Sequence, residues 1–288
     1  MHKRLRTAFL CLALLVAAPA RATSDFERVE FPALKDFDGQ AVTLDGWLYR
    51  PRGTGPFPAL VLLHGCSGMY GSQGYVTPSY RHWAELLRDE GYIALLVDSF
   101  GPRGYRSICD LQKRPILESR ERVEDAYAAL QWLSQQADVA AGRVGLIGWS
   151  NGGTGTLYAM RATTQPQGGF RAAVAFYPGC TTISKAQTPY TPYAPLLILI
   201  GEADDWTPAA PCKQVADRAK ALGAPLDIVA YPGAHHSFDR INSPVRYRPT
   251  VRNLNKPDRL GATVGEHPQA REDAIGRTKA FFAQALKN

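Results

Sequence analysis

The amino-acid sequence predicts an α/β protein with a mostly parallel, doubly wound β-sheet and helices on both faces. Short runs of consecutive apolar residues, typical of strands buried on both faces, alternate along the chain with longer stretches of helical period. The apolar content of 45% is ordinary for a globular protein, and 288 residues can bury a large core. No internal repeat or long linker divides the sequence, so we expect one domain.

The first predicted elements are two strands joined by a turn. Residues 28–34 and 41–49 are rich in strand-forming side chains, and an Asp-Gly dipeptide typical of hairpin turns lies between them. A loop rich in proline and glycine follows at 51–58. The run Ala-Leu-Val-Leu-Leu at 59–63 then predicts the first strand that is buried on both faces.

The same two patterns predict the remaining strands and helices. Val123, Tyr127, Leu130 and Leu133, for example, recur at helical spacing on one stripe. Further strands are expected over 93–97, 144–149, 172–176, 196–200 and 227–231, and helices over 80–91, 118–136, 152–162, 211–222 and 269–286. The polar stretch 239–269 has neither pattern, and we expect a long irregular connection that covers the site or binds a partner.

The first 22 residues are typical of a secretory signal peptide. Lys3, Arg4 and Arg6 precede an apolar segment at 8–18, and Ala-Arg-Ala at 20–22 supplies the small residues of a cleavage site. The apolar segment is too short to span a bilayer, which favours cleavage after residue 22 over the alternative of a membrane anchor. We therefore expect a signal peptide over 1–22 and a domain over 23–288 that is periplasmic or secreted.

The net charge gives no reason to expect nucleic acid or an anionic membrane as partner. Removal of residues 1–22 takes away four cations and no acid, which lowers the formal charge from +7 to +3. That bias is small, and no basic stripe with interleaved aromatic residues occurs. We expect neither nucleic-acid binding nor stable membrane insertion, and the sequence does not indicate an oligomeric state.

Four cysteines remain after residue 22, and an even number in an exported chain predicts disulfides. We expect Cys180 to pair with Cys212, because each follows a predicted strand end on the same side of the sheet. Cys66 and Cys109 then form the remaining pair, and buried free thiols are the alternative. Spacings of the CxxC or HxxxH kind do not occur, so we expect no metal.

The segment 144–153, Val-Gly-Leu-Ile-Gly-Trp-Ser-Asn-Gly-Gly, carries the strongest chemical signal. Ser150 lies between Gly148 and Gly152 at the junction of a predicted strand and helix, which is the G-x-S-x-G pattern of a nucleophile elbow. Such a turn holds the serine in a strained conformation with its hydroxyl exposed, and the two glycines remove side-chain collisions. We predict Ser150 as a nucleophile, with the dipole of the following helix directed at its oxygen.

A serine hydroxyl needs a general base and an acid that orients the base, and both follow the serine in this kind of site. Two later predicted strands lead into Asp204-Asp205 and His235-His236. We assign His236 as the base because a Ser-Phe pair follows it, and His235 is the alternative. We assign Asp204 as the acid and a turn or capping role to Asp205, and the reverse assignment stays open.

Acyl transfer also needs two hydrogen-bond donors for the developing oxyanion. The backbone N–H of Asn151, directly after the nucleophile, is one candidate. The second is the backbone N–H of Cys66, in the His-Gly-Cys-Ser-Gly loop at 64–68 that follows a predicted strand. We expect His64 to orient this loop by hydrogen bonding and not to act as a base.

These motifs resemble the α/β-hydrolase superfamily and, within it, the dienelactone hydrolase family, over essentially the whole chain after residue 22. The resemblance is carried by the segments 62–66, 98–100, 148–153, 201–204 and 236–238. It implies an α/β-hydrolase fold with a triad of Ser150, Asp204 and His236. The family's acid lies four residues before a proline, which matches Asp204 and Pro208.

Two positions depart from the members that hydrolyse dienelactone. Those members have a cysteine nucleophile where this chain has Ser150, and a glutamate where this chain has Gly65. The resemblance therefore implies a serine-nucleophile member that cleaves carboxylic esters of small molecules through an acyl-serine intermediate, without a cofactor. An acyltransferase, a peptidase and a non-catalytic binding protein on the same fold are the alternatives.

Two groups of residues beside the predicted loops bear on specificity. Aromatic side chains either form an apolar pocket or pack the loops; they are Tyr70, Tyr75, Trp149 and Trp206. Arg103 and Arg106 either bind a substrate carboxylate or are solvated.

Overall fold

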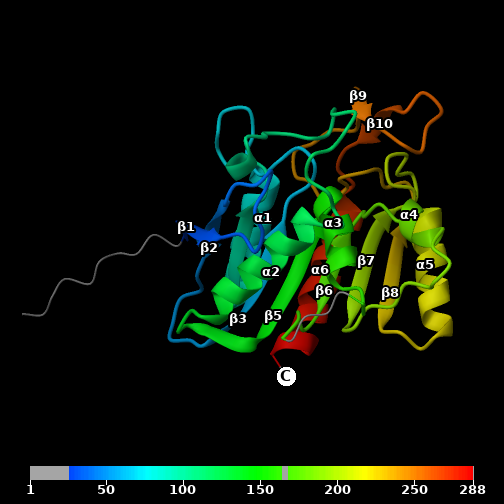
Figure 1. Ribbon diagram of the computed structural model, residues 1–288. Helices are drawn as coiled ribbons and strands as arrows, with labels where there is room; N and C mark the ends of the chain where they lie inside the picture. The colour runs from blue at the N-terminus through cyan, green and yellow to red at the C-terminus, as the bar shows by residue number, and fades with distance from the viewer. Residues whose placement is uncertain (1–25, 164–167, 288) are drawn as a thin grey trace, which may run out of the picture.

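The central sheet has eight strands in the computed structural model, which describes residues 26–163 and 168–287 (Figure 1). The strands are β1 (Phe26–Pro32), β2 (Thr43–Tyr49), β3 (Phe57–Leu63), β4 (Ile93–Asp98), β5 (Val139–Trp149), β6 (Ala173–Phe176), β7 (Leu196–Gly201) and β8 (Leu226–Tyr231). They lie in the order β1-β2-β4-β3-β5-β6-β7-β8, with β3 to β8 parallel and β1 and β2 antiparallel at one edge. This mostly parallel sheet confirms the predicted fold class.

Helices cover both faces of the sheet (Figure 1). α2 (Glu121–Ser134) and α3 (Asn151–Ala159) lie on one face, and α1 (Pro78–Asp89) and α6 (Pro268–Leu286) lie on the other. α5 (Ala209–Ala221) packs against β7 and β8. Two further helices, η1 (Gly101–Arg103) and α4 (Thr181–Ser184), are too short for a hydrophobic period to predict them.

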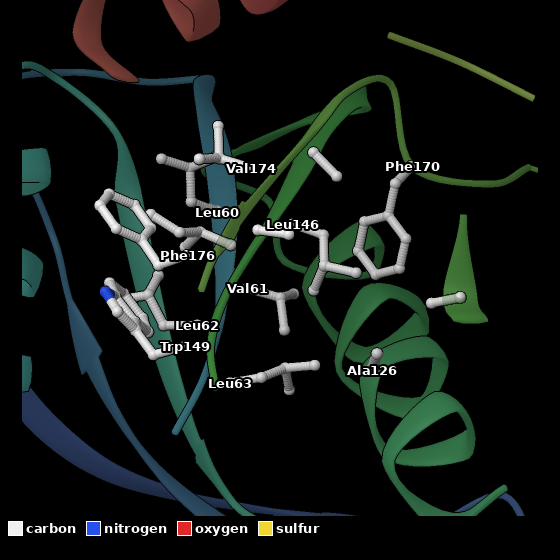
Figure 2. Packing of buried hydrophobic residues seen from close by; sticks show 14 of the residues in the cluster. Leu60, Val61, Leu62, Leu63, Ala126, Leu146, Trp149, Phe170, Val174 and Phe176 are labelled. Atoms are coloured by element: carbon white, nitrogen blue, oxygen red, sulfur yellow. The ribbon is translucent and has the colours of Figure 1, made fainter. Parts of the chain in front are cut away.

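The core fills the space between the sheet and these helices. Figure 2 shows Val61 and Leu63 on the side of α2, whereas Leu62 points to the opposite face beside Trp149. All four side chains are fully buried. Burial of each side chain of this size stabilises the fold by about 1.5–3 kcal/mol. The core therefore fixes β3 and β5, whose carboxyl ends carry two of the predicted catalytic loops.

Residues 239–269 contain a second sheet, which corrects the expectation of an irregular connection. β9 (Arg246–Arg252) pairs antiparallel with β10 (Leu260–Val264), beyond the carboxyl ends of the central strands (Figure 1). Val251 is the one buried residue of β9, so no apolar run marks the strand in the sequence. The hairpin is attached to the predicted catalytic loops instead: β10 forms a bridge to His236 through Val264.

Two disulfides are present among the described residues, and the second joins the start of α4 to α5. Cys66 pairs with Cys109 and Cys180 pairs with Cys212, at S–S distances of 2.08 and 2.03 Å, as the sequence predicted. The predicted signal peptide at 1–22 lies outside the described residues. Among the described residues, no helix is both long and apolar enough to cross a membrane.

Candidate active site

Ser150 occupies a sharp turn between β5 and α3. Its φ of 55° and ψ of −115° are rare for a residue with a side chain, and such strain occurs mainly at functional positions. A Cβ atom on Gly148 would lie 2.3 Å from the carbonyl oxygen of Gly152, and one on Gly152 would lie 2.1 Å from that of Leu63. Only glycine fits both positions, which is the steric reason for the G-x-S-x-G spacing.

His236 reaches the serine from the loop after β8. Its Nε2 lies 2.9 Å from the Oγ of Ser150, and its Nδ1 lies 2.8 Å from the Oδ2 of Asp204. The side chains of Asp204 and His236 are almost fully buried. The arrangement orients one ring nitrogen toward a carboxylate and the other toward a hydroxyl, as a general base for the serine requires.

The carboxylate of Asp204 is held by the turn that follows it. Its Oδ1 accepts the backbone N–H groups of Trp206 and Thr207, at 2.9 and 2.8 Å, and its Oδ2 accepts the hydroxyl of Thr207 at 2.9 Å. The second oxygen therefore stays directed at His236. The sequence analysis did not single out Thr207, although its place directly before a proline at the start of α5 is a local signal.

The two competing residues point elsewhere. The ring of His235 lies 2.9 Å from the carbonyl oxygen of Ala203 through its Nδ1. Asp205 accepts the amide of Thr263 in β10 at 2.7 Å and pairs with Lys256 at 2.9 Å. Asp205 thus attaches the β9–β10 hairpin, whereas the turn role predicted for it is filled by Asp204 itself.

The loop after β3 lies beside the nucleophile. Cys66 and Ser150 line the same hollow, and Asn151 is the first residue of α3, where a backbone N–H has no partner within the helix. The two predicted oxyanion donors are therefore at the same edge of the sheet as Ser150. The Asn151 side chain is directed away from this role and donates to Glu118 at 2.6 Å.

His64 organises this loop from a fully buried position. Its Nδ1 lies 2.8 Å from the Gly65 carbonyl, and its Nε2 lies 3.2 Å from the backbone nitrogen of Ser99. A neutral ring with the proton on Nδ1 satisfies both contacts. Burial, together with the nearby charge of Arg122, lowers the pKa of His64, which agrees with the neutral form.

Arg122 of α2 is a second organising residue, and the sequence analysis missed it. Its guanidinium donates to the His64 carbonyl at 2.6 Å and lies over the ring of Phe100, with 5.3 Å between Cζ and the ring centroid. Burial lowers its pKa to about 10. In the sequence it stands among charged residues of an amphipathic helix, a pattern typical of a solvated face.

The remaining candidates for specificity are mostly structural. Arg103 is buried and forms two hydrogen bonds to Asp125, at 2.9 and 2.8 Å, so it is neither solvated nor available to a substrate. Arg106 donates to the carbonyl of Gly71. Trp149 is buried in the core, whereas Trp206 lies against His236, with 4.8 Å between ring centroids.

The other two aromatic candidates do not line the site. Tyr70 accepts a hydrogen bond from the indole of Trp47 at 3.2 Å, and Tyr75 is exposed to solvent. Trp206 lines the larger cleft beside the nucleophile, and Trp149 lines only the small hollow next to it.

A cleft of about 1060 Å³ opens next to Ser150. Cys66, Asn151 and Trp206 line it near the nucleophile, and Leu117 and Leu254 lie farther along its walls. A cleft of this size can accommodate a ligand larger than a simple acetate ester. Within the residues that the structure describes, no group of three histidine, cysteine or acidic side chains is suited to a metal ion.

The comparison with protein families supports the reading of this site as that of a hydrolase. The model of the dienelactone hydrolase family matches residues 44–286. A protein of Bradyrhizobium named as a probable 2-oxo-3-(5-oxofuran-2-ylidene)propanoate lactonase is 28% identical over 204 residues, which cover 67% of this chain and 77% of that protein.

Solved structures show the same fold at low sequence identity. A dienelactone hydrolase-like promiscuous phosphotriesterase from metagenomic libraries superimposes with a TM-score of 0.63 at 19% identity, covering 91% of this chain and 100% of that chain. The acylaminoacyl peptidase of Pyrococcus horikoshii superimposes with a TM-score of 0.63 at 20% identity, covering 92% of this chain and 42% of that chain. These structures show the α/β-hydrolase fold, and the match over residues 44–286 shows that the chain belongs to the dienelactone hydrolase family of hydrolases.

Proposed function

We propose that the protein is an exported serine hydrolase that cleaves carboxylic esters through an acyl-Ser150 intermediate. The observation that carries the proposal is the continuous contact from Ser150 through His236 to Asp204, at 2.9 and 2.8 Å. A serine hydroxyl is a poor nucleophile without such a base. The intact triad argues against a non-catalytic binding protein.

The first half-reaction transfers the acyl group to the enzyme. His236 takes the proton from Ser150 as the serine oxygen attacks the ester carbonyl carbon, and the backbone N–H groups of Cys66 and Asn151 stabilise the negative charge that forms on the carbonyl oxygen. The imidazolium then donates its proton to the departing alkoxide, and the alcohol leaves. Asp204 stabilises the imidazolium while it exists.

The second half-reaction returns the enzyme to its starting state. His236 removes a proton from a water molecule, whose oxygen attacks the acyl carbon, and the resulting tetrahedral intermediate is again stabilised at the two amides. The bond to the Ser150 oxygen then breaks, Ser150 recovers its proton from His236, and the carboxylic acid is released. An alcohol in place of water would give the acyltransferase alternative, which product analysis with competing alcohols distinguishes.

The space around position 65 supports a substrate other than dienelactone. A Cβ atom on Gly65 would lie 3.4 Å from the Cβ of Ser150 and 3.3 Å from the hydroxyl of Tyr80. A side chain at this position would contact the nucleophile directly, and this chain has neither the acidic side chain there nor the thiol that the resemblance associates with dienelactone.

The test is a comparison of Ser150→Ala with the wild-type protein on p-nitrophenyl acetate and butyrate. We expect the substitution to lower kcat/KM by at least about 10⁴-fold and to abolish labelling by a fluorophosphonate probe. Ser134→Ala, which removes a hydroxyl bonded to the Leu130 carbonyl in α2, is the matched control and should keep full activity. Retained turnover in Ser150→Ala would reject the proposed nucleophile.

Peptidase activity and export are tested separately. A p-nitroanilide with the same acyl group, which releases p-nitroaniline in place of p-nitrophenol, should be cleaved far more slowly than the ester. The mass of the protein recovered from the periplasm or medium should correspond to a chain that begins at Thr23; an intact N-terminus there would reject the signal peptide.

A further inference from the structure

The buried carboxylate of Asp239 belongs to the same loop as His236, three residues farther along the chain. Its side chain accepts three hydrogen bonds from aromatic residues: from the indole N–H groups of Trp83 and Trp149 at 2.8 and 2.9 Å, and from the hydroxyl of Tyr177 at 2.6 Å. Asp239 is 2% exposed. Among the described residues it forms no ion pair, and these three donors supply its side-chain hydrogen bonds.

The three donors come from three separate parts of the fold. Trp83 belongs to α1, Trp149 is the last residue of β5, and Tyr177 directly follows β6. Trp149 is also the residue before Ser150, so one of the three hydrogen bonds joins the base loop to the nucleophile elbow. No polar group of the catalytic contact itself takes part in this cluster.

The backbone between His236 and Asp239 turns at Ser237, and both residues contact Tyr177. Ser237 has a φ of 65°, and Phe238 is buried against Tyr177, with 5.6 Å between ring centroids. The ring of Tyr177 also packs on the imidazole of His236, at 4.6 Å between centroids. The ring that donates to Asp239 is thus the same ring that forms one side of the histidine's enclosure.

We propose that Asp239 is a positioning residue that fixes the distance between the imidazole of His236 and the hydroxyl of Ser150. The inference rests on the proposed function of these two residues. The three hydrogen bonds hold the loop of His236, the nucleophile elbow and the segment after β6 in one arrangement.

Substitutions at position 239 distinguish a role of its hydrogen bonds from a role of its packing alone. An indole N–H can only donate, so residue 239 must present an acceptor to both tryptophans. Asparagine keeps a carbonyl oxygen for the two indoles and an NH₂ group that can donate to the Tyr177 hydroxyl. Leucine has the same branching at Cγ but carries methyl groups in place of the two oxygens, so it offers no acceptor and leaves three buried donors without partners.

The test compares Asp239→Asn and Asp239→Leu with wild-type protein on p-nitrophenyl acetate, with active sites counted by the burst of p-nitrophenol. A misplacement of about 1 Å can reduce a rate by about 100-fold, so we expect Asp239→Leu to lower kcat per active site by at least about tenfold, with KM changed by less than about threefold. Asp239→Asn should recover kcat to within about threefold of wild type.

Phe282→Leu is the control for lost stability. Phe282 is fully buried on α6 and lies against Tyr92, away from the catalytic loops, so its truncation should lower Tm without lowering kcat per active site. If Asp239→Leu does not fold, Tyr177→Phe takes its place: it removes one of the three donors and keeps the ring, and a decrease in kcat per site of about threefold or more is then expected.

Two results would overturn the inference. One is an unchanged kcat per active site in Asp239→Leu, or in Tyr177→Phe where the first variant is unfolded. The other is an Asp239→Asn variant as slow as Asp239→Leu. Wild-type protein that shows no ester cleavage and no Ser150 labelling would instead reject the proposed function, so the two failures are distinguishable.

Discussion

Cys66 is linked through its sulfur to Cys109, and the segment around Cys109 also holds the Cys66 backbone. The Cys66 carbonyl accepts the amide of Ile108 at 2.9 Å, while the Cys109 carbonyl accepts the amide of Arg252 at 3.0 Å. The disulfide therefore joins the predicted oxyanion loop to the segment after β4, and the hydrogen bond from Arg252 connects that segment to the β9–β10 hairpin. From this position we predict that the disulfide affects turnover as well as stability.

Loss of this disulfide should lower both stability and turnover. The bond closes 43 residues of chain, and a disulfide of this kind stabilises a fold by about 2–4 kcal/mol. In Cys66→Ala/Cys109→Ala we expect a lower Tm, and a lower kcat because the amide of residue 66 is less firmly held. Thermal unfolding and p-nitrophenyl acetate kinetics measure the two effects.

The second disulfide offers a matched control. Cys180–Cys212 closes 32 residues and joins α4 to α5, without contributing a predicted oxyanion donor. Cys180→Ala/Cys212→Ala should lose a similar amount of stability with a smaller decrease in kcat. Equal decreases in kcat for both double variants would contradict a specific role of the first disulfide.

Arg122 should be required for the shape of the oxyanion loop. Arg122→Met keeps the apolar stem but removes the donor to the His64 carbonyl, and an unsatisfied buried acceptor costs about 1–3 kcal/mol. We expect a lower free energy of unfolding and a lower kcat, with Arg122→Lys between Met and wild type. Arg143→Met, at an exposed position, is the control; wild-type kinetics in Arg122→Met would show that the loop keeps its shape without the guanidinium.

Sequence patterns predict the parts of this fold whose backbone structure is determined by neighbouring residues. The buried strands are continuous apolar runs, and the elbow is specified by glycines within two residues of Ser150. The order of the later loops then indicates Asp204-Asp205 and His235-His236, because each pair follows a strand that ends at the same edge of the sheet, and it leaves the choice within each pair open. These features need no knowledge of distant contacts.

The residues that were missed act through partners far away in the sequence. Arg122 binds a carbonyl 58 residues away, and Asp239 binds an indole 156 residues away. The neighbouring residues do not indicate these roles, because Arg122 lies in a helix rich in charges and Asp239 lies in a polar stretch. The sequence pattern did not predict the β9–β10 hairpin for a related reason: its strands pack on loops and not in the central core.

Acid should destabilise the protein partly through His64. Burial lowers the pKa of His64 below its ordinary value of 6.5, so the unfolded chain binds this proton more tightly than the folded chain does. The contribution is complete above pH 6.5 and is lost as the pH falls below it, at a slope of at most about 1.4 kcal/mol per pH unit for one proton. Urea unfolding between pH 7.5 and pH 5 measures the slope.

His64→Gln isolates this contribution, because glutamine keeps a donor and an acceptor but does not titrate. Its free energy of unfolding should vary less with pH over the acidic part of this interval than that of the wild type. The same dependence in both proteins would mean that other groups, and not His64, account for the loss of stability in acid.

The neighbouring aspartates 204 and 205 should respond very differently to the same substitution. Asp204→Asn replaces the carboxylate that faces His236 Nδ1, and we expect kcat to fall by about 10³–10⁴-fold in a protein that remains folded. Asp205→Asn removes a partly exposed ion pair to Lys256, which is worth less than about 1 kcal/mol, and kcat should stay within about threefold of wild type. Steady-state kinetics and circular dichroism on the two variants decide the assignment. A large loss of kcat in Asp205→Asn with little loss in Asp204→Asn would reverse it, and would require the turn after β7 to rearrange so that the second carboxylate reaches the imidazole.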